Sequence, residues 1–235
     1  MSEPVIKVRG LRIAYGDLEA VRGIDLEVEP GEVFAFLGPN GAGKTSTVEA
    51  LEGYRSRSGG EVEVLGLDPA RISHSGAAGR RWRERVGIVL QTCELDPFLT
   101  VEESLRMYAG YYREPRRVDE VLALVGLADK AGDRTGKLSG GQQRRLDVGI
   151  ALVGNPDLIF LDEPTTGFDP SARRHAWEMI GGLRDLGKTI FLTTHYMDEA
   201  QALADRVMIL SAGQVVGSSR KIRSGLPTRA MPTSS

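Results

Sequence analysis

The stretch VFAFLGPNGAGKT (residues 33–45) joins an apolar run, a glycine-rich loop and the start of a helix. VFAFL has the length and composition of a buried strand, and TSTVEALEGY (residues 45–54) has helical periodicity that ends at Gly53. A glycine-rich loop between a strand and a helix exposes backbone NH groups and the positive end of the helix, so this stretch predicts a phosphate-binding loop.

The same loop predicts how a nucleoside triphosphate and its metal ion would be held. Lys44 is expected to reach the β- and γ-phosphates, and the hydroxyl of Thr45 is expected to bind Mg²⁺. The residues that we expect to contact ATP in this stretch are Gly38, Pro39, Asn40, Gly41, Ala42, Gly43, Lys44, Thr45 and Ser46.

A pair of acidic residues follows a second apolar run, LIFL (residues 158–161). Asp162 and Glu163 therefore lie at the carboxyl end of a predicted buried strand, where open α/β sheets place their ligands. Two adjacent carboxylates are costly to desolvate there unless a cation offsets them. We assign Asp162 to Mg²⁺, directly or through a water molecule, and Glu163 to the general base that polarises the attacking water.

Strand and helix patterns alternate along most of the chain, which predicts an α/β fold with a mainly parallel sheet covered on both faces. Short alternating runs at residues 5–8 and 11–14 instead predict an N-terminal antiparallel β subdomain. Residues 92–150, approximately, read as an inserted α-helical subdomain. We expect one domain over residues 1–217 and a disordered tail over residues 218–235, which are rich in Ser, Pro and Arg.

The segment LSGGQ (residues 138–142) supplies a second predicted anion site. Ser139 and Gln142 have the spacing of a capping box, and the residues after them have helical periodicity. Gly140 and Gly141 would then expose the NH groups of the helix start, where negative charge is favoured.

The chain resembles the ATP-binding-cassette superfamily in three motifs and in their order: GPNGAGKT, LSGGQ and the apolar run that ends in Asp-Glu. The resemblance covers residues 5–217. It implies a P-loop NTPase fold, hydrolysis of ATP to ADP and phosphate, and ATP and Mg²⁺ as cofactors. In that superfamily LSGGQ is called the signature segment (residues 138–142 here), and the signature segment of one subunit covers the γ-phosphate bound by the other. Ser139, Gly140, Gly141 and Gln142 would therefore contact ATP in a partner chain, and two chains would enclose two ATP molecules.

The resemblance also assigns four further positions. Tyr15 matches the aromatic residue that stacks on adenine, and Gln91 matches the glutamine that senses Mg²⁺ and the γ-phosphate. His195 matches the switch histidine that orients the water, and Asp169 matches the aspartate that links the two ATP sites. Taken alone, Tyr15 is equally consistent with an exposed turn residue and Gln91 with an ordinary strand-end amide. The expected catalytic set is Lys44, Gln91, Glu163 and His195.

The segments LDEPTTGFDP and LTTHYMDEA are most similar to the exporter branch that moves drugs, antibiotics and polysaccharides. They imply an ATPase subunit that drives a separate transmembrane permease as a homodimer or a heterodimer. Members of that branch commonly continue with an additional C-terminal region, which we expect to be missing here. Two alternatives stay open at this point: a soluble ATPase of the superfamily that acts on ribosomes or DNA, and a regulatory subunit that binds ATP without hydrolysing it.

The composition of the chain bears on which partners it binds and on the compartment in which it works. The formal net charge of −2 gives no basic footprint, so nucleic acid is not an expected partner. Cys93 is the single cysteine, so the chain is expected to form no internal disulfide. The N-terminus carries charged residues where a signal peptide would be apolar. No apolar run reaches the roughly 18 residues of a spanning helix. We expect a cytoplasmic protein held peripherally at the cytoplasmic face of the membrane by its permease.

Overall fold

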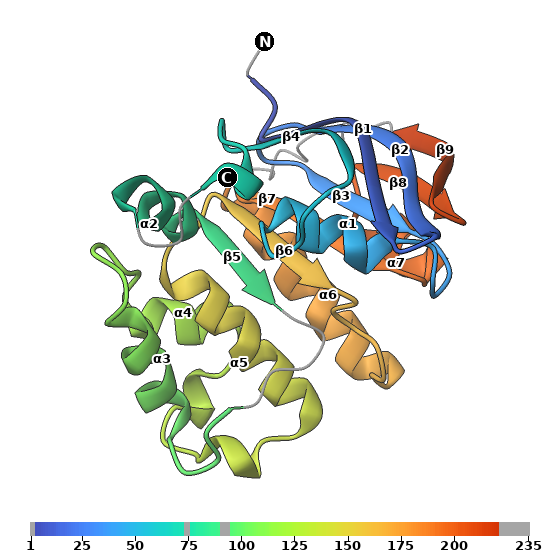
Figure 1. Cartoon of the computed structure of the whole chain (residues 1–235). Coiled ribbons are helices and arrows are strands. Elements are labelled where there is room, and N and C mark those ends of the chain that lie inside the picture. The colour runs from blue at the N-terminus through green and yellow to red at the C-terminus, as the bar shows by residue number, and fades with distance from the viewer. Residues whose placement is uncertain (1–2, 73–75, 90–94, 221–235) are drawn as a thin grey trace, which may run out of the picture.

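The computed structural model describes residues 3–72, 76–89 and 95–220, which include two β-sheets and two groups of helices (Figure 1). The larger sheet has six strands in the order β5-β6-β7-β3-β8-β9, and every neighbouring pair is parallel except β8 with β9. The prediction of a mainly parallel sheet is therefore confirmed. Its strands are β3 (Val33–Leu37), β5 (Val86–Val89), β6 (Leu158–Asp162), β7 (Thr189–Thr194), β8 (Arg206–Ser211) and β9 (Gln214–Arg220).

The central strands are buried on both sides and separate two apolar cores. Along β3, Phe34 and Phe36 enter one core, while Val33 and Ala35 enter the other, as the two-residue period of a strand requires. Phe191 of β7 stacks on Phe34 with ring centroids 5.3 Å apart. The strand VFAFL is fully buried, which explains its continuous apolar composition.

The N-terminal antiparallel subdomain is a three-stranded sheet in the order β2-β1-β4, formed by β1 (Ile6–Tyr15), β2 (Leu18–Val28) and β4 (Gly59–Val64). The two short runs predicted at 5–8 and 11–14 are in fact one strand. Its register shifts between Val8 and Leu11, so these two residues, three apart, both face the core. This sheet and α1 (Lys44–Leu51) cover one face of the large sheet.

Helices α3 (Val101–Ala109), α4 (Val118–Leu124) and α5 (Gly140–Val153) form a separate lobe, below the sheets in Figure 1. The capping box predicted at Ser139 with Gln142 is present, and Thr100 with Glu103 forms another at the start of α3. Asp169 caps the start of α6 (Pro170–Asp185). The remaining helices are α2 (Ala77–Glu84), α7 (Met197–Leu203) and three short 3₁₀ turns at Pro69–Arg71, Ala128–Lys130 and Thr135–Lys137.

Two boundaries differ from those expected. Strand β9 continues to Arg220, past residue 217 where a disordered tail was expected to follow, because its backbone stays paired with β8 up to Arg206. The last helix of the lobe ends at Val153 rather than near 150. Over the described ranges, none of the helices has both the length and the apolarity that a membrane crossing needs.

Candidate nucleotide-binding site

The glycine-rich loop leaves the carboxyl end of β3 and leads into α1, with backbone geometry that only glycine fits. Gly43 has φ of 100°, and a Cβ atom there would lie 2.5 Å from the carbonyl oxygen of Ala20. A Cβ atom on Gly38 would lie 2.4 Å from the carbonyl oxygen of Leu210. The loop is thus pressed against two neighbouring strands, and at Gly38 and Gly43 only a residue without a side chain allows this close approach.

Lys44 is held inside this loop and is only 5% exposed. Its Nζ donates hydrogen bonds to the carbonyl oxygens of Gly38 (2.8 Å) and Pro39 (3.2 Å). The same nitrogen lies 3.5 Å from Oε1 of Glu163. The cation is therefore fixed between the loop and the acidic strand end.

The acidic strand end is fixed by its neighbour β7. The parallel register pairs Asp162 with Thr193, whose hydroxyl donates to Oδ1 of Asp162 and accepts the NH of Glu163 at 3.0 Å. Arg144 of α5 donates to the carbonyl oxygen of Asp162 at 2.8 Å. Sequence reasoning did not identify Thr193 or Arg144. The polar pair Thr193-Thr194 at the end of an apolar strand was the available signal for the first, and none pointed to the second.

Glu163 has a left-handed backbone, with φ of 46°, which turns its side chain toward Lys44 and His195. Oε1 lies 3.3 Å from Nδ1 of His195, and Oε2 accepts a hydrogen bond from Thr166 at 3.1 Å. Burial acts to raise the pKa of Glu163, but Thr166, His195 and Lys44 together outweigh it and lower the pKa below its ordinary value. The carboxyl group is therefore ionised at neutral pH.

An open pocket of about 450 Å³ joins the loop to the acidic strand end and to Tyr15. The hydroxyl of Tyr15 is 2.9 Å from that of Ser46, and the guanidinium of Arg55 lies 4.8 Å from the centre of the Tyr15 ring. The ring is thus held at the rim by α1 and the turn after it. Arg55 is a contact that the sequence did not reveal. The lining residues include Tyr15, Asn40, Gly41, Gly43, Lys44, Thr45, Ser46, Asp162 and Glu163.

The donors in this pocket fit a magnesium ion that arrives with a nucleotide. Within residues 3–72, 76–89 and 95–220, His, Cys, Asp and Glu side chains form no cluster of three or more that could hold a metal alone. Mg²⁺ needs no such cluster, because it usually binds one or two protein oxygens and completes its shell with phosphates and water. Thr45 and Asp162 both line this pocket and supply hard oxygen donors.

The signature segment lines a different pocket of about 680 Å³, between the start of α5 and the loop before α6. Ser139 accepts a hydrogen bond from the NH of Gln142, whose side chain accepts the NH of Ser139. Gly140 is exposed, and a Cβ atom there would meet nothing within 4 Å. Asp169, on the far wall, accepts the NH groups of Ser171 and Ala172.

Within one chain, most of the predicted site residues are therefore divided between two pockets, and Glu163 lines both. Gly38, Pro39, Ala42 and Gln142 are not among the lining residues of either pocket. Lys44, Thr45, Asp162 and Tyr15 line the first, while Ser139, Gly140, Gly141 and Asp169 line the second. His195 joins the first group through Glu163. Gln91 lies outside the described residues.

The family model described as ABC transporter matches residues 21–166 of the chain. Nod factor export ATP-binding protein I of Cupriavidus metallidurans is 41% identical over 229 residues, which cover 95% of this chain and 71% of that protein. The protein of the same name from Burkholderia thailandensis is 42% identical and covers 97% of this chain and 72% of its own length.

Solved structures match the fold over nearly the whole chain. cbiO1 from Clostridium perfringens, part of the ABC transporter complex cbiONQ, is 29% identical with a TM-score of 0.82, covering 93% of this chain and 89% of that one. The ATP-binding cassette MJ0796, in a dimeric post-hydrolysis state bound to ADP and Pi, is 25% identical with a TM-score of 0.79, covering 92% and 98%.

Proposed function

Because this chain belongs to the ABC transporter family as one of its ATP-binding subunits, we propose that it hydrolyses MgATP and thereby drives a separate transmembrane permease that exports its cargo. The direction of transport is supported by relatives at 40–42% identity that are named for Nod factor export. The chain would work at the cytoplasmic face of the membrane, where the permease holds it.

The observation that carries this proposal is the position of Glu163. Its ionised carboxylate lies 3.5 Å from the ammonium of Lys44 and 3.3 Å from the imidazole of His195, beside the glycine-rich loop. A carboxylate with a lowered pKa can accept a proton from a water molecule beside the γ-phosphate, while Lys44 stabilises the charge that develops on the phosphate. His195, whose Nδ1 lies beside the same oxygen of Glu163, would orient that water.

Magnesium, when bound with ATP, would neutralise charge on the β- and γ-phosphates. Thr45 and Asp162 would hold it, and Gln91 is proposed as a further ligand. Thr193 keeps the carboxyl of Asp162 turned into the pocket by its hydrogen bond to Oδ1.

A second copy would complete the site. Glu163 faces both pockets of its own chain, but the exposed helix start at Ser139 lines only the pocket away from Lys44. A partner chain arranged head to tail would bring its Ser139–Gln142 helix start over the γ-phosphate, where backbone NH groups favour the anion. ATP would thus close the dimer, hydrolysis would open it, and the helical lobe with Gln91 would transmit the movement to the permease.

Replacing Glu163 with glutamine tests the proposal most directly. Glu163→Gln should keep ATP binding, lower the rate of phosphate release by at least about a hundredfold, and leave an ATP-bound dimer that is visible by size-exclusion chromatography with light scattering. Glu178→Gln is the matched control, because Glu178 is exposed on α6 and should leave turnover unchanged. Near-normal hydrolysis by Glu163→Gln would contradict the assignment of the general base.

A further inference from the structure

Helix α2 and its C-cap carry arginines that the nucleotide site does not use, namely Arg80, Arg81, Arg83 and Arg85. Two of them already have a place in the fold. Arg85 forms an ion pair of 2.6 Å with an aspartate between α5 and β6, and Arg83 lines a cavity of about 270 Å³ together with the buried Glu52 and several aromatic residues. Arg80 and Arg81 line neither that cavity nor the two pockets described above, so they belong to a different surface.

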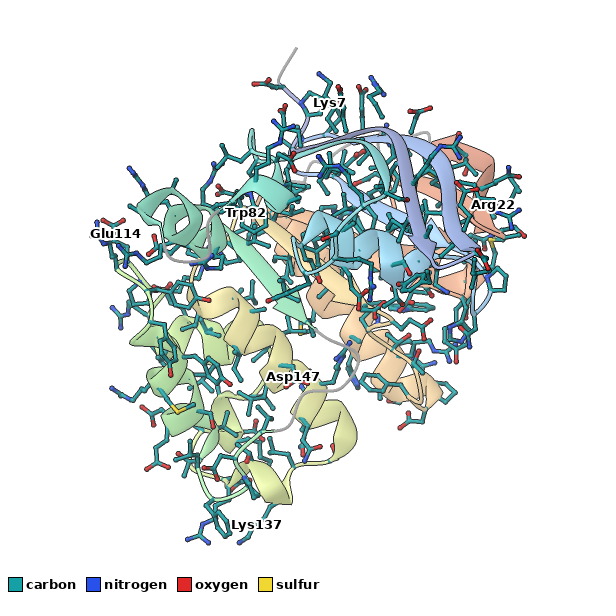
Figure 2. The ribbon with its side chains drawn as sticks, in the orientation of Figure 1. Lys7, Arg22, Trp82, Glu114, Lys137 and Asp147 are labelled. Carbon is teal, nitrogen blue, oxygen red and sulfur yellow. The ribbon has the colours of Figure 1, made fainter. Side chains whose placement is uncertain are left out.

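A second open cavity, of about 250 Å³, lies between α2 and the segment that joins α3 to α4. Arg80 and Arg81 line it from α2, and Arg113 lines it from the joining segment. The other lining residues are Ala77 and Glu84. Their spacing from the two arginines of α2, three or four positions, places all four on one side of the helix. Figure 2 shows Glu114, the residue after Arg113, on the same side of the molecule as α2. We call this space the arginine cavity.

The arginine cavity holds an excess of positive charge, because three guanidinium groups line it against the one carboxylate of Glu84. The three arginines are exposed, and among residues 3–72, 76–89 and 95–220 none of them forms an ion pair. Neighbouring arginines do form ion pairs, since Arg106 lies 2.6 Å from Glu102 and Arg117 lies 2.7 Å from Asp119. Like charges that share a hollow repel one another, and an anion among them would offset that repulsion.

The chemistry of arginine favours a phosphate group as that anion. A guanidinium group is a planar fork of donors that can bind two oxygens of a phosphate at once. A phosphate presents oxygens in several directions, so it suits arginines that approach from two different elements. A carboxylate presents two oxygens in one plane and would match less of the positive charge. A volume of about 250 Å³ is below the usual range for drug-sized ligands, which favours a small headgroup over a whole nucleotide.

We propose that the arginine cavity binds the phosphate group of an anionic phospholipid at the membrane surface. The proposal rests on the proposed function only because that function places the chain beside a membrane. Each arginine close to an anionic leaflet contributes to binding, and this cavity gathers three of them around one headgroup. A bound phosphate would join α2, which leads into β5 of the large sheet, to the helical lobe that carries Arg113. Free inorganic phosphate has the same chemistry, and the test separates the two sources.

Sedimentation with vesicles measures this binding on the full chain without nucleotide. The chain should bind vesicles of phosphatidylcholine that contain phosphatidylglycerol, and it should not bind vesicles of phosphatidylcholine alone. Arg80→Gln, Arg81→Gln and Arg113→Gln should each weaken binding by about fivefold, which is the share of one arginine at an anionic surface.

Two further substitutions distinguish a built site from a general attraction between charges. Arg85→Gln removes the same charge from the end of the same helix, but Arg85 is paired with Asp157 and does not line the arginine cavity. It should therefore change the affinity by less than about twofold at physiological salt. Glu84→Gln removes a carboxylate that lines the cavity, so it should strengthen binding by about twofold or more.

Soluble probes identify the source of the phosphate. Glycerol 1-phosphate has the chemistry of the headgroup without acyl chains, and inorganic phosphate has the phosphate alone. Titrations followed by the NMR signals of the arginine Nε–H groups should show binding of both probes that is at least about tenfold weaker than binding to vesicles, because a vesicle presents many headgroups at once. Inorganic phosphate that binds as tightly as the vesicles would assign the cavity to free phosphate and overturn the lipid ligand.

Three other results would overturn the proposal: equal binding to vesicles with and without phosphatidylglycerol, equal losses for Arg85→Gln and Arg113→Gln, or weaker binding by Glu84→Gln. Far-UV circular dichroism of each variant should match that of the unmodified chain, which shows that the variants fold. The arginine cavity shares no lining residue with the pockets around Lys44 and Ser139, so ATP hydrolysis in solution should also be unchanged. Vesicle binding without nucleotide requires no hydrolysis, so a failure of the Glu163→Gln test would leave this outcome unaffected.

Discussion

Removing the buried hydroxyl group of Thr165, in the loop after β6, should measurably destabilise the protein. Thr165 is fully buried, and its Oγ1 donates to Oε1 of Glu199 on α7 at 2.7 Å. Glu199 is also fully buried. The same oxygen of Glu199 accepts a longer hydrogen bond, of 3.3 Å, from the indole NH of Trp177 on α6. This carboxyl group therefore joins the loop after β6 to both α6 and α7.

Thr165→Val keeps the shape of the side chain and deletes the donor. A hydrogen bond to a carboxylate contributes about 1.5–3 kcal/mol, and the other oxygen of Glu199 already has no hydrogen-bond partner among the described residues. For a chain of this size about 1 kcal/mol corresponds to about 2–4 °C, so Tm should fall by about 3–12 °C. Urea unfolding followed by tryptophan fluorescence would measure the loss directly, because Trp177 is one of only two tryptophans and lies at the perturbed site.

A hydroxyl-bearing residue on the surface provides the control. Ser171 is exposed at the start of α6, so Ser171→Ala should change the free energy of unfolding by no more than about 0.5 kcal/mol. Equal losses for the two variants, or a loss below about 0.5 kcal/mol for Thr165→Val, would show that the buried carboxyl group of Glu199 does not hold the loop.

Two further predictions concern the catalytic groups. Thr166→Val removes a hydrogen bond that lowers the pKa of Glu163. The pKa of Glu163 should therefore rise, and the acid limb of the pH profile of kcat/KM should move to higher pH. An unshifted acid limb would show that Thr166 does not set the pKa of Glu163. His195→Ala should lower kcat by about a hundredfold or more with little change in ATP affinity. The control His175→Ala, on the exposed surface of α6, should leave both quantities unchanged. Similar kcat values for the two variants would contradict the role given to His195.

Much of the site was predictable because its signals are local in sequence. The glycines of residues 38–43 and the capping box at Ser139 depend on backbone geometry within a few residues, and both took the predicted form. The apolar run before Asp162 likewise predicted a buried strand whose carboxyl end faces the phosphate loop. In these cases each residue type is explained by its own turn, strand or helix end.

Other contacts depend on elements far apart in the chain and could not be read from the sequence. Thr193 reaches Asp162 only because β6 and β7 pair in a particular parallel register. Arg144 reaches the same strand end across the boundary between the helical lobe and the sheet. Nothing near Glu52 in the sequence predicts that aromatic residues from α2 and α3 surround it.

Local sequence is enough to predict the phosphate loop, the acidic strand end, the exposed helix start at Ser139 and the alternation of strands and helices, because hydrophobic period, glycine conformation and capping act over short distances. The division of the candidate site residues between two pockets that share Glu163, and the burial of Glu52, depend instead on how distant segments pack together. Strand order, register and the packing of the helical lobe set those distances, and they arise from burial summed over the whole chain rather than from any single segment.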